Sequence, residues 1–190
     1  MSLTVEKCLQ AWTNSFRQMN AKADIVFFGD SLTYYGDFSS VFPDKIVCNL
    51  GLRGDTIQGM IDRAEQVKLL EPKVVYLMAG INDIASYLPV QLENLYEKLI
   101  QKLLFLLSGQ ELAIQSILPV NDKAFTISCN NNQILKFNSN LRKLAIFYKL
   151  PYIDLFSAYV VVGVMPEKLT KDGIHLQQEA YKQWYDMLKK

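Results

Sequence analysis

The chain has 190 residues, of which 50% are hydrophobic and 21% are charged, and this composition excludes a disordered protein. Its 20 Lys and Arg residues balance 19 Asp and Glu residues, so the net charge of +1 gives no electrostatic reason to expect nucleic acid or an anionic membrane as a partner. The longest apolar runs, residues 103–107 and 159–165, are far shorter than the roughly 18–20 residues that span a bilayer.

Five short apolar runs are predicted to form β-strands. They are nearly continuous in apolar residues, which is typical of strands that are buried on both faces of a sheet. The predicted strands are residues 24–28, 45–49, 73–78, 111–116 and 152–154.

Segments with apolar residues at helical spacing separate these strands. A helix is expected at residues 3–16, and three apolar stripes predict helices within residues 57–67, 92–104 and 134–148. The polar cluster at residues 130–133 favours a helix start. The last helix is expected to begin just after His175 and to end near Leu188.

This alternation of strands and helices predicts an α/β fold with one open, doubly wound parallel sheet. Both faces of such a sheet are covered by helices, and the working site lies beyond the carboxyl ends of the strands. No internal repeat, low-complexity segment or linker interrupts the pattern, so residues 1–190 are expected to form a single domain.

Four segments contain residues that could take part in catalysis, and each segment follows a predicted strand or precedes the last predicted helix. Ser31 follows the first predicted strand, Gly51 the second and Asn82 the third, while Asp172 and His175 lie in the loop before the last helix. Because the carboxyl ends of parallel strands meet at one edge of the sheet, we expect all four segments on the same rim.

Each segment, taken alone, is more simply interpreted as structural. A serine in this position is often a helix N-cap, and Gly51 and Gly54 are suited to turns with positive φ. Asn82-Asp83 and Asp172-Gly173 are typical turn sequences.

The combination favours catalysis. A serine acyl transfer needs a nucleophile, a base, a group that orients the base and donors for the oxyanion, and the chain offers each. His175 is the only histidine in the chain, so if a histidine activates Ser31, it must be His175. The chain lacks the Gly-x-Ser-x-Gly elbow, and Asp172 and His175 lie only three residues apart, so an α/β-hydrolase is disfavoured.

The four segments resemble, in order, the four blocks of the GDSL/SGNH hydrolase family. The matching residues are Gly29-Asp30-Ser31-Leu32, Gly51 within Asn-x-Gly-x-x-Gly-Asp-Thr, Gly80-x-Asn82-Asp83 and Asp172-x-x-His175. The resemblance spans residues 24–188, and four blocks in order are a strong signal where each alone is weak. The chain is most similar to short acylhydrolases related to the catalytic subunits of platelet-activating-factor acetylhydrolase and to bacterial carbohydrate acetylesterases.

The resemblance implies a flavodoxin-like three-layer α/β/α sandwich and a role for each matching residue. Ser31 matches the nucleophile, His175 the general base that later acts as an acid, and Asp172 the residue that orients His175. The backbone N–H groups of Gly51 and Ser31 and the side-chain amide of Asn82 match the donors of the oxyanion hole. Relatives often carry Arg directly before the second-block glycine, where this chain has Leu50, and Arg53 lies three positions further on.

Three functions remain open from the sequence. The first is a serine esterase that removes a short acyl group, such as acetyl, from a carbohydrate or another small alcohol. The second is a thioesterase or lysophospholipase, with residues 103–107 and 159–165 lining an acyl groove. The third is a flavodoxin-like binding module without catalysis. Aromatic residues near the expected site are candidates for stacking on a sugar or for the core: Tyr34, Tyr35, Phe38 and Tyr87.

The cysteines and the N-terminal sequence bear on cofactors and location. Cys8, Cys48 and Cys129 have no metal-site spacing, so neither a metal nor another cofactor is expected, and reduced thiols suit a cytoplasmic protein. Residues 1–20 lack the pattern of a signal peptide. The expected partner is a small-molecule ester. A homodimer is left open, with residues 159–165 as a dimer contact, a substrate wall or core.

Overall fold

Five parallel strands form one sheet in the computed structural model, which describes residues 22–189. The strands are β1 (Ile25–Gly29), β2 (Val47–Gly51), β3 (Val74–Met78), β4 (Glu111–Gln115) and β5 (Tyr152–Ile153). Their order across the sheet is β2-β1-β3-β4-β5, as in flavodoxin-like proteins. The predicted α/β fold is confirmed, and each strand lies within two residues of its predicted bounds.

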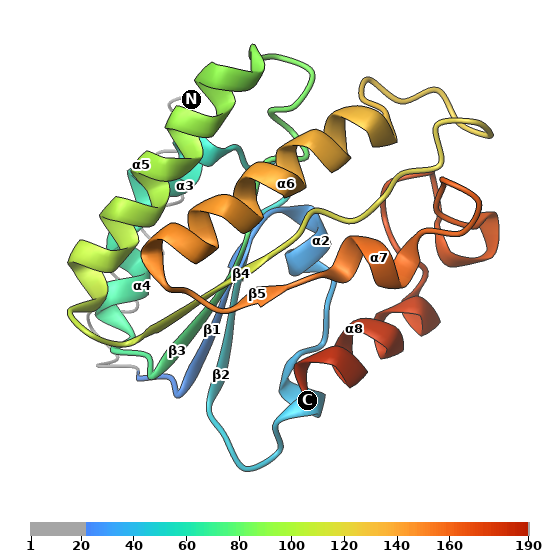
Figure 1. Cartoon of the computed structure of the whole chain (residues 1–190). Helices are drawn as coiled ribbons and strands as arrows, with labels where there is room; N and C mark the ends of the chain where they lie inside the picture. Colours follow the sequence, from blue (N-terminus) through green and yellow to red (C-terminus); the bar gives the residue numbers. More distant parts are fainter. Residues whose placement is uncertain (1–21, 190) are drawn as a thin grey trace.

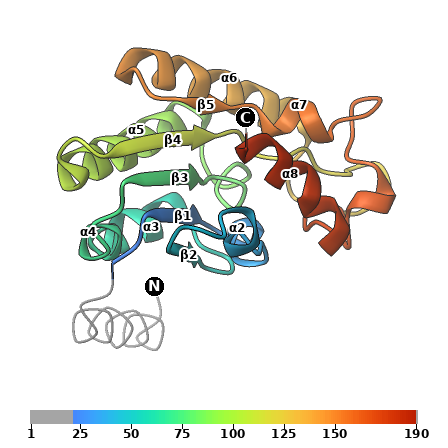
Figure 2. The same cartoon turned by 90° about the horizontal axis from the view of Figure 1, so that it is seen from below.

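Helices cover both faces of this sheet (Figure 1). The helices are α2 (Ser31–Tyr34), α3 (Ile57–Arg63), α4 (Glu65–Leu69), α5 (Pro89–Leu107), α6 (Asn131–Tyr148), α7 (Leu155–Tyr159) and α8 (Tyr181–Leu188). Helix α5 contacts α3, α4 and α6 on one face, while α8 lies across the sheet from them and contacts α7 (Figure 2). The helix expected at residues 3–16 lies outside the described residues.

Two neighbouring residues of β1 show how the sheet separates the two helical layers. Side chains alternate between the faces of a strand, so Phe27 and Phe28 point in opposite directions. Phe28 lies under the guanidinium of Arg63 in α3, at 4.4 Å from the ring centroid. Phe27 stacks on Phe38 at 3.8 Å between centroids, and Phe38 meets Trp184 of α8. Phe38 is therefore a core residue, which settles its role among the four aromatic candidates.

Two helix boundaries differ from the sequence prediction. The stripe over residues 57–67 is divided at Ala64 into α3 and α4. The last α-helix begins at Tyr181 and not directly after His175, because residues 170–176 are tied back on themselves. The carbonyl of His175 accepts hydrogen bonds from Lys171 N (2.8 Å) and Thr170 Oγ1 (2.9 Å). A 3₁₀ turn, Gln178–Ala180, then leads into α8.

The apolar run at residues 159–165 has a divided role. Tyr159 and Met165 are buried, whereas Val161 and Val162 are exposed on a turn closed by a bridge between Val161 and Val164. The run is therefore partly core and partly an exposed turn.

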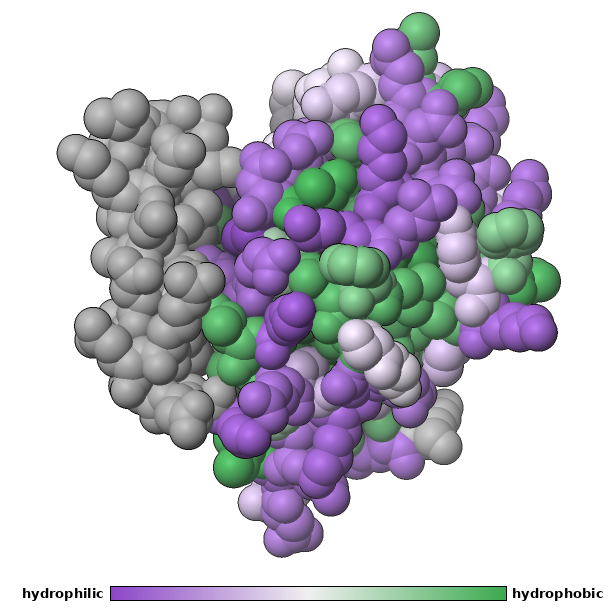
Figure 3. Space-filling view, turned by 90° about the vertical axis from the view of Figure 1, so that its left-hand side faces the viewer, coloured by the Kyte–Doolittle hydropathy of each residue, from purple (hydrophilic) through white to green (hydrophobic). Residues whose placement is uncertain are grey.

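The surface carries further apolar side chains. On the side of the molecule that α4 and α5 occupy, apolar residues gather in a patch bordered by hydrophilic ones (Figure 3). Large side chains are also exposed near the ends of α5 and α6, namely Phe105, Ile146 and Phe147. Within residues 22–189, no helix is both long and apolar enough to cross a membrane.

Candidate active site

Ser31 lies at the carboxyl end of β1, where the chain turns directly into α2. Asp30 is the N-cap of this helix, since its side chain accepts a hydrogen bond from Leu32 N at 2.9 Å. The interpretation of Ser31 as the N-cap is therefore wrong. Ser31 is instead the first residue of the helix, whose own N–H has no carbonyl partner within the helix. Its side chain is thus free of a capping role.

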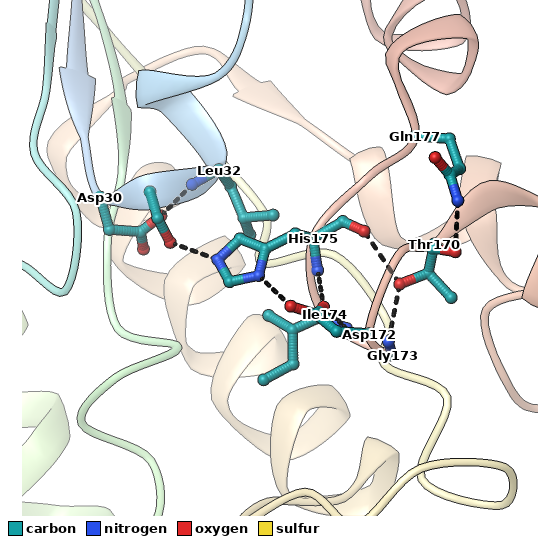
Figure 4. Close-up of polar contacts among 9 residues, drawn as sticks. Asp30, Leu32, Thr170, Asp172, Gly173, Ile174, His175 and Gln177 are labelled. Atoms are coloured by element: carbon teal, nitrogen blue, oxygen red, sulfur yellow. Dashed lines mark hydrogen bonds and ion pairs between the residues drawn. The ribbon is translucent and has the colours of Figure 1, made fainter.

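The side chain of Ser31 meets the loop before α8. Its Oγ lies 2.9 Å from His175 Nε2, although 144 residues separate the two in sequence. On the other side of the ring, His175 Nδ1 lies 2.7 Å from Asp172 Oδ2 (Figure 4). The three residues thus form one continuous hydrogen-bonded series, as the sequence predicts for their positions.

Asp172 also organises the loop that carries His175. Its Oδ1 accepts hydrogen bonds from the backbone N–H of His175 at 2.8 Å and of Ile174 at 3.1 Å. Partial burial alone would raise the pKa of Asp172, but these bonds and the bond from the His175 ring outweigh it and hold the pKa below its usual value. Asp172 is therefore ionised at neutral pH and can only accept. This favours the tautomer in which Nδ1 donates to Asp172 and Nε2 accepts from Ser31.

The candidate oxyanion donors end β2 and follow β3. Gly51 is the last residue of β2, paired in register with Gly29, and does not lie in the turn that follows. A Cβ at this position would overlap with the backbone of Tyr34, so only glycine allows β2 to approach α2 this closely. Positive φ is instead required at Gly54, where φ is 71°.

The donors differ in their availability. The N–H of Gly51 already donates to Asn49 Oδ1 at 2.8 Å. The side-chain nitrogen of Asn82 donates one hydrogen to the carbonyl of Asp55, at 2.8 Å, and retains a second. This bond fixes the orientation of the Asn82 amide. Asn82 and the N–H of Ser31 are thus better placed to bind an oxyanion than the N–H of Gly51, which would have to share its hydrogen with Asn49.

A buried group of charged residues lies beneath this rim, and the sequence analysis missed it. Arg63 donates to Asp55 Oδ2 at 2.6 Å and to the carbonyl of Gly29 at 3.0 Å. Asp30 and Asp83 are also fully buried, and one carboxyl oxygen of each accepts no hydrogen bond from residues 22–189. Arg63 thus pairs directly with Asp55 and acts on Asp30 only through its charge. Arg63 lies three residues after Met60 and four before Val67, on the apolar face of its segment, and this spacing is the signal for its burial.

Burial raises the pKa of all three acids in this group. Burial, assisted by the neighbouring carboxylates, raises the pKa of Asp30 to about 7 and outweighs the hydrogen bond from Leu32. Burial likewise raises the pKa of Asp83 to about 6, against the bond that it accepts from Ile57 N. The paired acid of the group is Asp55, whose charge is balanced by Arg63.

Asp30→Asn should change how stability depends on pH. Because the folded pKa of Asp30 is raised, its contribution to stability is fully present below about pH 4 and is lost as the pH rises to about 7. Each titrating proton changes the free energy of unfolding by about 1.4 kcal/mol per pH unit. Asparagine caps a helix as well as aspartate does, but it cannot titrate. The variant should therefore gain stability relative to the unmodified protein between pH 4 and 7, measured by urea unfolding at several pH values.

Asp24→Asn is a contrasting control. The hydrogen bond from Lys73 is the largest of the effects that lower the pKa of Asp24, so its contribution has the opposite sign and disappears as the pH falls. If the free energy of unfolding of the Asp30→Asn protein depended on pH in the same way as that of the unmodified protein, Asp30 would not be the titrating acid.

Two tyrosines lie beside the candidate catalytic side chains. The Tyr35 ring stands edge-on to the His175 ring, with 5.7 Å between centroids. Tyr34 is 50% exposed and contacts Tyr35, whereas Tyr87 is 41% exposed and lies two residues before α5. Residues 22–189 contain no group of three or more His, Cys, Asp and Glu side chains placed to hold a metal ion.

Comparison with protein families gives one match. The model of the GDSL-like lipase/acylhydrolase family matches residues 27–183, which include all the residues of the site described above. No curated protein matches the chain.

Several solved structures share the fold. A Streptococcus pneumonia protein, described as a candidate platelet activating factor, has a TM-score of 0.81 and 23% identity, covering 100% of this chain and 98% of that one. A GDSL-like lipase from Bacteroides thetaiotaomicron has a TM-score of 0.74 and 20% identity, with 95% of each chain covered. An acetyl xylan esterase has a TM-score of 0.73 and 23% identity, covering 87% of this chain and 97% of that one.

Proposed function

The chain belongs to the GDSL-like lipase/acylhydrolase family and hydrolyses esters, and we propose that it does so as a serine esterase acting on short-chain acyl esters. The observation that carries the proposal is the series of contacts from Ser31 Oγ through the His175 ring to Asp172, at 2.9 and 2.7 Å. This is the geometry that a serine nucleophile and its base require.

The proposed mechanism follows from these contacts. His175 Nε2 takes the proton of Ser31 as Oγ attacks the ester carbonyl, and Asp172 stabilises the imidazolium that results. The alcohol then leaves with that proton, and Ser31 holds the acyl group. A water molecule, deprotonated by His175, attacks the acyl-enzyme and releases the acid. Asn82 and the N–H of Ser31 donate to the oxyanion in both steps.

Two observations support a short acyl group. The segment at residues 103–107, considered for an acyl groove, ends α5 on the side of the sheet where β4 begins, opposite the rim that carries Ser31. Most of it is core, since Leu103, Leu106 and Leu107 are buried. One of the similar solved structures is an acetyl xylan esterase, which favours acetyl as the acyl group and a carbohydrate as the alcohol.

A chain-length series of p-nitrophenyl esters tests this proposal. We expect kcat/KM to be highest for the acetate and to fall through the butyrate to the octanoate, with Ser31→Ala protein as the blank. A maximum at octanoate or longer would favour the thioesterase or lysophospholipase. Absence of turnover, together with no labelling of Ser31 by a fluorophosphonate probe, would favour a binding module.

Asn82→Ala should lower kcat by about 10²–10³-fold, or roughly 3–4 kcal/mol, with a much smaller change in KM. The side-chain amide acts on the charge that develops in the transition state, so its loss affects the chemical step more than substrate binding. Steady-state kinetics with p-nitrophenyl acetate measures both constants. Gln58→Ala, an exposed change on α3, is the matched control and should retain full activity. If Asn82→Ala raised KM and left kcat unchanged, Asn82 would be excluded from the oxyanion hole.

Location and assembly are part of the proposal. Cys48 and Cys129 are free thiols, which supports a cytoplasmic protein. We retain a single domain over residues 1–190 as the expected organisation, and a homodimer stays an open expectation.

A further inference from the structure

Two cations converge on one aromatic ring at the edge of the proposed active site. The guanidinium carbon of Arg53 lies 5.9 Å from the centroid of the Tyr35 ring, and Lys171 Nζ lies 5.4 Å from the same centroid. The Tyr35 ring in turn stands edge-on to His175. Arg53 and Lys171 come from loops that are more than 100 residues apart in sequence, so the fold alone brings them together.

The backbone fixes each of these residues in place. Arg53 occupies a turn closed by the bond from Asp55 N to the carbonyl of Leu52, with Gly54 supplying the positive φ that the turn needs. Lys171 N donates to the carbonyl of His175 at 2.8 Å, so the backbone of Lys171 is held against the backbone of His175 in the same loop. Tyr35 lies one helical turn after Ser31, and its N–H donates to the Ser31 carbonyl at 3.2 Å.

The two cations have no acidic partner in the part of the chain that the structure describes. Within residues 22–189, neither side chain takes part in an ion pair or a hydrogen bond. The acid next to Lys171 in sequence, Asp172, is already bound to the His175 ring and to two backbone N–H groups, and the acid nearest to Arg53, Asp55, is paired with Arg63. Neither positive charge beside the ring is balanced by a carboxylate, so an anion bound next to Tyr35 would be attracted by both cations. Arginine in particular matches the planar geometry of carboxylate and phosphate groups.

The position of Tyr35 indicates which part of the substrate would carry the anion. In the proposed mechanism, His175 delivers its proton to the leaving alcohol, so the alcohol must lie on the His175 side of the scissile bond. Tyr35, Arg53 and Lys171 lie on that side. We propose that Arg53 and Lys171 are specificity residues that select esters whose alcohol part carries a carboxylate or phosphate group. This inference rests on the proposed esterase function and names its substrate class.

A pair of esters that differ in the charge of the alcohol part tests the proposal. 4-Acetoxybenzoate and methyl 4-acetoxybenzoate share the acetyl group and the phenolic leaving group, but only the first is an anion at neutral pH. The quantity to compare is the ratio of kcat/KM for the anionic ester to that for the neutral ester. Differences in intrinsic reactivity cancel when this ratio is compared between proteins.

The variants are Arg53→Gln, Lys171→Gln and the double variant. We expect each single change to lower the ratio by about threefold and the double change by about tenfold, the range typical of exposed charge pairs. In the unmodified protein, raising the ionic strength from about 0.01 to about 1 M should lower the ratio, because the screening length falls from about 30 to about 3 Å. Lys168→Gln removes a neighbouring exposed lysine and should leave the ratio unchanged.

A titration without turnover separates this inference from the proposed function. Ser31→Ala protein is titrated with each ester and followed by NMR chemical shifts, in the presence and absence of the two Gln substitutions. Tighter binding of the anionic ester, lost with Arg53 and Lys171, supports the inference even if no ester is hydrolysed. An unchanged ratio in the double variant, or equal binding of both esters, would overturn the inference while hydrolysis of the neutral ester left the esterase function intact.

Discussion

His175→Ala should lower the turnover of ester substrates by about 10⁴-fold or more, because loss of the base removes both proton transfers of the proposed mechanism. His175 is the only histidine in the chain, so no neighbouring imidazole can replace it. The effect should appear in kcat with p-nitrophenyl acetate. The side chain of His175 is 29% exposed and does not belong to the hydrophobic core, so the melting temperature should change little.

Asp172→Asn provides the matched comparison for this prediction. Asparagine can still accept from the backbone N–H groups of Ile174 and His175, but it no longer provides a carboxylate to receive Nδ1–H. The ring should then lose its preferred tautomer, and activity should fall without a change in the loop.

Wild-type turnover by His175→Ala protein would exclude the serine–histidine mechanism altogether.

The sequence was sufficient to predict the parts of the site that depend on topology. Ser31, Gly51 and Asn82 each end or follow a strand that was recognisable from its apolar residues, and parallel strands must deliver these positions to one edge. The lone histidine then restricted the choice of base to His175. The predicted rim is confirmed for the strand ends, since Gly29 and Gly51 are in register on neighbouring strands.

Other features depend on side-chain packing and were not predictable in this way. Phe38 follows a short helix and has no periodic signal, yet it is buried because Phe27 and Trp184 lie on either side of it. The N–H of Gly51 is occupied by Asn49, a contact between residues two apart that turn chemistry permits but does not require. Arg63 lies at a spacing that fits the apolar face of its helix, but charged helical residues are usually exposed, so the structure was needed to establish that it is buried with Asp55.

Arg63→Met should destabilise the fold by about 3–5 kcal/mol, the usual cost of removing one member of a buried ion pair. The change leaves Asp55 without its 2.6 Å partner and removes the donor to the Gly29 carbonyl. Asp30 and Asp83 lie in the same group, so they add to the uncompensated negative charge. Methionine keeps the apolar contact with Phe28, and the loss is therefore electrostatic. Urea unfolding at pH 7 measures the change in the free energy of unfolding.

Arg142→Met is the matched control on the same scaffold. Arg142 also pairs with an aspartate, Asp154 at 2.7 Å, and also lies over an aromatic ring, but its side chain is 53% exposed. Exposed pairs contribute at most about 1 kcal/mol, so this variant should lose far less stability. A second substitution, Asp55→Asn in the Arg63→Met protein, should restore part of the loss because it removes the unpaired charge. Equal losses in the two Arg→Met variants would show that the Asp55–Arg63 pair contributes no more than a surface contact.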